Sequence, residues 1–104
     1  MLPDFVDVHY RASTALDRLT PDQFEAVTVK FTTLRQLPVE DWQREGVRLV
    51  KAPVYAVRLA RGDLNVFFSP QPQGRFLIED FASQERLDWV AESFARSQKQ
   101  VSPT

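Results

Sequence analysis

The sequence predicts an α+β protein in which a mainly antiparallel, curled sheet packs against helices. Two observations favour this class. Apolar residues in the first half recur three and four apart, as on one face of a helix, whereas residues 54–80 alternate with the period of two that strands show. The length of 104 residues and a hydrophobic content of 43% are typical of one globular domain. We expect this domain to cover residues 1–97, with a tail over 98–104.

The first half predicts a short strand followed by a helical hairpin. Phe5–His9 mixes apolar and β-branched residues and is interpreted as a strand. Tyr10–Leu19 is interpreted as a short helix. A second helix begins after Thr20, where Pro21 suits the first helical position and Gln23 completes a capping box. Its apolar residues share one face: Phe24, Val27, Phe31 and Leu34.

The second half predicts a three-stranded meander. Its strands are Val54–Leu59, Leu64–Ser69 and Arg75–Asp80, and the turns between them contain Gly62 and Gly74. We interpret residues 47–50 as an early start of the first of these strands, before Pro53 interrupts the pairing.

A last helix is predicted after Ser83, which is suited to cap it. Its apolar stripe consists of Leu87, Val90, Ala91 and Phe94. The predicted order is therefore β-α-α-β-β-β-α, with a four-stranded sheet, an N-terminal helical hairpin and a C-terminal helix.

Charge is distributed unevenly along the chain. The formal net charge is only −1, but five basic residues and one acidic residue lie between Arg44 and Arg61. A basic stripe on one element is typical of a surface that binds phosphates. The alternative is a solvated outer face, or edge strands protected by charge. The candidate nucleic-acid-binding residues are Arg48, Lys51, Arg58, Arg61 and Arg75.

Several chemistries are excluded by residue counts. The chain has no cysteine, which excludes disulfides, thiolate metal sites and Cys nucleophiles, and His9 is its one histidine. Asp7, Glu79 and Asp80 are interpreted as separate solvated acids, so we expect no metal and no cofactor. No apolar run approaches about 18 residues, and the N-terminus lacks the pattern of a signal peptide. We therefore expect a cytoplasmic protein without a membrane partner.

The aromatic residues are interpreted mainly as packing residues. Tyr55 alternates with core positions of its strand, so the core is its favoured place. Phe67 and Phe68 are adjacent in a strand and must point to opposite faces. Trp42 and Trp89 are expected to cover the sheet edges or a dimer contact.

Three segments carry a resemblance to a known family. They are ALDRLTPDQFEAVTVKFTTLRQLP (15–38), GVRLVKAPVYAVRLARGDLNVFF (46–68) and RFLIEDFASQERLDWV (75–90). In its order of elements and motifs, over about residues 5–90, the chain resembles the RelE/ParE superfamily of toxins from bacterial type II toxin–antitoxin systems. The matching positions are Tyr55, Arg58, Leu59, Gly62, Val66, Phe68, Glu85 and Arg86.

The resemblance implies a RelE-like fold, a cognate antitoxin partner and an action on ribosome-bound mRNA. In ribosome-dependent members, basic side chains hold the scissile phosphate while the ribose 2′-OH attacks it in line, without a metal. Arg58 falls on a basic position of the family and is the candidate catalytic residue. The chain departs from the family at Ala56, Asn65 and Gln84, where basic residues are usual, and at Trp89-Val90, where a Tyr is usual.

These departures leave three functions open. The first is a ribosome-dependent mRNA endoribonuclease in which Arg58 acts. The second is a catalytically inactive interaction module on the same scaffold. The third is a gyrase inhibitor of the ParE type, which does not depend on the nuclease residues.

Overall fold

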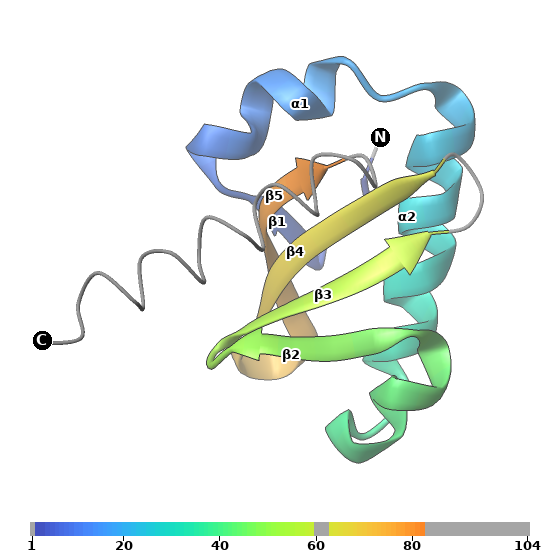
Figure 1. Ribbon diagram of the computed structural model, residues 1–104, viewed down its shortest axis with the longest axis vertical. Coiled ribbons are helices and arrows are strands. Elements are labelled where there is room, and N and C mark those ends of the chain that lie inside the picture. The colour runs from blue at the N-terminus through green and yellow to red at the C-terminus, as the bar shows by residue number, and fades with distance from the viewer. Residues whose placement is uncertain (1, 60–62, 83–104) are drawn as a thin grey trace, which may run out of the picture.

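Figure 1 shows the computed structural model, which describes residues 2–59 and 63–82. Its elements place helices against a sheet, so the predicted α+β class is confirmed. Several predictions lie outside the described residues, namely the helix after Ser83, the tail 98–104, the Gly62 turn, and the positions of Arg61, Gln84 and Trp89.

The helical hairpin is present, but its first arm is shorter than predicted. Tyr10–Leu19 contains a 3₁₀ turn, η1 (Tyr10–Ala12), that continues into the five-residue helix α1 (Ser13–Asp17). Ala12 is the one fully buried residue of these two elements, and Ala15 and Leu16 pack against the core only in part.

The long helix α2 (Pro21–Arg35) begins where the capping box predicts. The Gln23 backbone N–H donates to Thr20 Oγ1 at 3.2 Å, and the Thr20 N–H donates to Gln23 Oε1 at 2.9 Å. Its buried residues, Val27, Phe31 and Leu34, are three of the four predicted from their spacing.

The sheet has five strands and mixed direction, whereas the sequence predicts four. The order is β1-β5-β4-β3-β2, and β1 runs parallel to β5 while the other pairs are antiparallel. The strands are β1 (Val6–Val8), β2 (Val47–Lys51), β3 (Val54–Leu59), β4 (Leu64–Gln71) and β5 (Arg75–Ala82).

The extra strand arises where the sequence predicts only an early start. Residues 47–51 form a strand of their own because the chain reverses at Ala52-Pro53, so that Lys51 pairs with Val54. Pro53 therefore sits in a hairpin turn instead of interrupting one long strand. Before β2, a 3₁₀ helix, η2 (Val39–Glu45), ends at Gly46, whose φ of 81° suits glycine.

The core lies between α2 and one face of the sheet. The Phe31 ring contacts Phe68 and Phe76, with centroids 4.9 Å and 5.0 Å apart. Trp42 from η2 is buried beside the same rings, and its indole N–H donates to the Leu34 carbonyl at 3.1 Å. Trp42 is therefore a core residue rather than a cover at the sheet edge.

Among the described residues, no helix is both long enough and apolar enough to cross a membrane.

Candidate nucleic-acid interface

The sheet face opposite α2, which we call the charged face, carries most of the candidate residues. Residues paired across antiparallel strands point to the same face. Arg48 pairs with Ala56, Ala56 with Phe67, and Phe67 with Asp80, so this row crosses the face from β2 to β5. The core residue Phe68 points the other way, which confirms that the two adjacent phenylalanines lie on opposite faces.

Three predicted cations follow one hairpin on the charged face, and we call them the basic ribbon: Arg48, Lys51 and Arg58. Lys51 pairs with Val54, Arg48 pairs with Ala56, and Arg58 follows two residues later on β3. Alternate residues of a strand lie about 6.8 Å apart. The register therefore spaces the three cations at successive steps along β2 and β3, and all three are exposed.

Arg58 forms an ion pair with Asp63, which directly precedes β4. Its guanidinium donates to Asp63 Oδ1 at 3.2 Å, and both side chains are more than half exposed. An exposed pair of this kind contributes under about 1 kcal/mol. A phosphate can therefore displace Asp63 at little cost.

Arg75 does not join the basic ribbon. It lies on β5 beside the edge strand β1, where its guanidinium donates to both Asp7 carboxylate oxygens at 3.0 Å and to the Asp4 carbonyl at 2.9 Å. Strands β4 and β3 separate β5 from β2. The fifth candidate, Arg61, lies outside the described residues.

The β5 side of the charged face is acidic and hydrogen-bonded. A register shift between Phe67 and Phe68 leaves Glu79 as an extra residue, so Glu79 and Asp80 both face this side. Arg11 from η1 donates to Glu79 Oε2 at 3.3 Å, and the Ser69 hydroxyl donates to Glu79 Oε1 at 3.3 Å.

His9 belongs to this hydrogen-bonded network. Its Nδ1 accepts hydrogen bonds from the Arg11 backbone N–H and from the Arg11 Nε, both at 3.2 Å. It thereby caps η1 and orients Arg11, which agrees with a structural role. Within residues 2–59 and 63–82, no three His, Asp or Glu side chains gather as metal ligands would.

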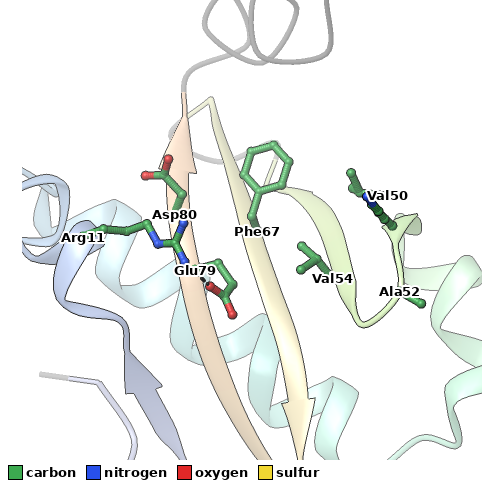
Figure 2. A pocket seen from close by; sticks show the side chains of 8 residues that line it. Arg11, Val50, Ala52, Val54, Phe67, Glu79 and Asp80 are labelled. Carbon is green, nitrogen blue, oxygen red and sulfur yellow. Dashed lines mark hydrogen bonds and ion pairs between the residues drawn. The ribbon is translucent and has the colours of Figure 1, made fainter. Parts of the chain in front are cut away.

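A hollow of about 280 Å³ lies between the two sides of the charged face (Figure 2). Lys51 borders it on the β2 side, and Arg11, Glu79 and Asp80 border it on the β5 side. The apolar part of its lining consists of Val50, Ala52, Val54 and Phe67.

Two positions at which the resemblance implies basic residues, Ala56 and Asn65, lie next to Arg58. Asn65 pairs directly with Arg58 and is buried, with its amide Nδ2 donating to the Ala82 carbonyl at 3.4 Å. Ala56 is buried two residues before Arg58. Tyr55 points to the opposite face, where its ring packs against Trp42 at 5.3 Å and stacks on Phe68 at 6.0 Å.

This arrangement is suited to binding phosphates and is sparse for catalysis. The basic ribbon supplies three cations on one surface, but the Tyr55 hydroxyl lies on a strand position that faces away from them. Asp80 is separated from Arg48 by three strand spacings, or about 14 Å. The acidic side therefore begins about three strands away from Arg48, and the side chains of Lys51, Glu79 and Asp80 meet only at the hollow between them.

The local sequence pattern does not indicate the place of Arg11 or the joint placement of Glu79 and Asp80 on one face. Strict alternation along β5 assigns the two acids to opposite faces, and the one-residue bulge that unites them has no signal in the sequence.

No family model matches the chain, and the comparison with curated proteins finds no match either.

Proposed function

We propose that the chain is a RelE/ParE-like toxin-family protein that binds RNA through the basic ribbon and has a cognate antitoxin as its partner. The observation that carries the proposal is the convergence of Arg48, Lys51 and Arg58 on one sheet face. Its target is ribosome-bound mRNA in the cytoplasm. The supporting sequence features are the three segments that resemble the superfamily.

The proposed reaction is metal-independent cleavage of the RNA backbone. Arg58 is the proposed residue that binds the scissile phosphate and balances the charge that develops on it. The ribose 2′-oxygen attacks the phosphorus and the bond to the 5′-oxygen breaks, which leaves a 2′,3′-cyclic phosphate and a 5′-hydroxyl end. The 2′-OH proton passes to water, and the leaving oxygen takes a proton from water. Fixed cations favour such a transition state because they need no reorganisation when the charge forms.

A second candidate is a non-catalytic interaction module on the same scaffold. Ala56 and Asn65 flank Arg58 where the family usually has cations, and both are buried. A single flexible arginine gives less electrostatic stabilisation than several fixed donors. The basic ribbon then serves to bind RNA or a partner without cleaving RNA.

Induced expression in a bacterium distinguishes these functions. The chain, its Arg58→Ala variant and an Arg44→Ala control are expressed in parallel; Arg44 is exposed on η2 and is not one of the ribbon residues. For each culture, growth is followed, 5′-hydroxyl ends of mRNA are mapped and ribosomes are isolated.

The nuclease proposal predicts growth arrest with cleaved mRNA on ribosomes, relieved by Arg58→Ala and not by Arg44→Ala. Normal growth with intact mRNA, together with co-purification of a small protein, contradicts cleavage and favours the interaction module. Growth arrest with a DNA-damage response and continuing translation favours the gyrase-inhibitor alternative.

A further inference from the structure

The hollow on the charged face has the size and lining of a site for one small ring system. Ligand pockets for drug-sized molecules have volumes of roughly 300–1,000 Å³, and this one is smaller, about 280 Å³. Its apolar lining includes Val54, which is partly exposed, and Phe67, which remains 7% exposed, and apolar side chains of this kind suit the flat face of a ring. Polar groups border it on two sides, Lys51 on one and Arg11, Glu79 and Asp80 on the other.

We propose that this hollow receives one nucleobase of the bound RNA, and that the Glu79 carboxylate selects guanine at that position. The inference rests on the proposed RNA binding and adds a base preference to it. Single-stranded RNA is generally read in this way, with splayed bases on apolar or aromatic side chains and hydrogen bonds to the base edges.

The dimensions of the charged face agree with a nucleotide lying across it. Lys51 on β2 and Glu79 on β5 are on strands about 14 Å apart. Both side chains are long and reach the same hollow, so the distance between their charged ends is shorter than the distance between the two strands. A phosphate at Lys51 therefore places its base over Val54 and Phe67, with the outer edge of the base toward Glu79.

The carboxylate determines which base fits. Both Glu79 oxygens are oriented, one by Arg11 and one by Ser69, and each has two lone pairs. Ionised carboxylates only accept hydrogen bonds, and guanine presents two adjacent donors, N1–H and the N2 amino group. Uracil presents one donor between two carbonyl oxygens, which a carboxylate repels. The Glu79 side chain remains 20% exposed, so a base can reach it.

The test measures the binding of labelled RNA heptamers that are uridine throughout except for a central G, A, C or U. Fluorescence anisotropy at low salt gives the dissociation constant of each heptamer for the wild-type chain and for three variants. Glu79→Gln removes the paired acceptors, and Val54→Phe fills the hollow. Glu40→Gln on η2 is the matched control, because it changes the net charge equally at an exposed position that does not line this hollow.

The proposal predicts that the central-G heptamer binds about tenfold more tightly than the all-uridine heptamer. Glu79→Gln and Val54→Phe should remove most of this preference, and Glu40→Gln should preserve it. Circular dichroism checks that each variant is folded. If Val54→Phe does not fold, the guanine preference of Glu79→Gln alone decides whether the base site exists.

Two other results overturn the proposal in different ways. Equal binding of all four heptamers, or a guanine preference that survives Glu79→Gln, refutes the base site and leaves RNA binding standing. The same absence of a Glu79-dependent base preference is expected if the hollow binds a side chain of a partner protein instead of a base. If the wild-type chain binds none of the heptamers, the proposed function fails and the base site fails with it.

Discussion

Neutralising Arg58 tests whether the basic ribbon binds RNA as one unit. If each ribbon cation contacts one phosphate of a single strand, the logarithm of the affinity falls with the logarithm of salt concentration with a slope of about −0.7 per contact. The three cations of the ribbon therefore predict a slope of about −2.1 for the wild-type chain. Arg58→Gln removes one contact and should change the slope to about −1.4.

The assay is fluorescence anisotropy of a labelled RNA heptamer in a salt titration. Between about 50 and 200 mM salt, the wild-type affinity should fall about 20-fold and the Arg58→Gln affinity about sevenfold. Arg75→Gln is the matched control, because Arg75 is bound to Asp7 on the β5 side of the same face, with β4 between it and the ribbon strands. Its salt slope should equal that of the wild type.

The reasoning is refuted if Arg58→Gln leaves the slope unchanged. It is also refuted if Arg75→Gln reduces the steepness of the salt dependence as much as Arg58→Gln does. RNA would then contact cations across the whole charged face and not the ribbon in particular.

Three further predictions concern single side chains. Phe31→Ala should lower the free energy of unfolding by about 3–5 kcal/mol in urea titrations, since Phe31 is fully buried against two aromatic rings; a loss below about 1 kcal/mol would contradict the described core. Thr20→Ala breaks the capping box and should cost about 1 kcal/mol in the same assay, whereas an unchanged stability would mean that the cap contributes nothing. Asp63→Asn removes the ion pair between Asp63 and Arg58 and should tighten RNA binding by about two- to fivefold; weaker binding would show that Asp63 positions Arg58 for RNA. The asparagine tolerates the φ of 47° at this position.

Local signals along the chain predict much of the fold. The capping box at Thr20 places the start of α2, and the period of two gives β3 its observed bounds, Val54–Leu59. The start of α2 and the bounds of β3 depend on residues that are close together in the sequence, so they can be predicted from the sequence alone. The separate strand β2 is missed because the sequence does not say whether Pro53 ends a pairing or occupies a turn.

The candidate site is predictable only in part. Alternation identifies Arg58 as facing away from the core, and pairing with β3 brings Arg48 and Lys51 to the same face. Arg75 also faces that side, but its distance from the ribbon depends on the strand order, which the local pattern does not contain. The place of Glu79 depends on a one-residue bulge, and a shift of one residue reverses the face of a side chain.

The most direct test of the central claim is an amide chemical-shift titration of the ¹⁵N-labelled chain with a single-stranded RNA heptamer. The account predicts that the largest shifts fall on β2 and β3, around Arg48, Lys51 and Arg58, with smaller shifts at Phe67 and Glu79. Shifts concentrated on α2, or none at a large excess of RNA, would contradict a nucleic-acid interface on the charged face.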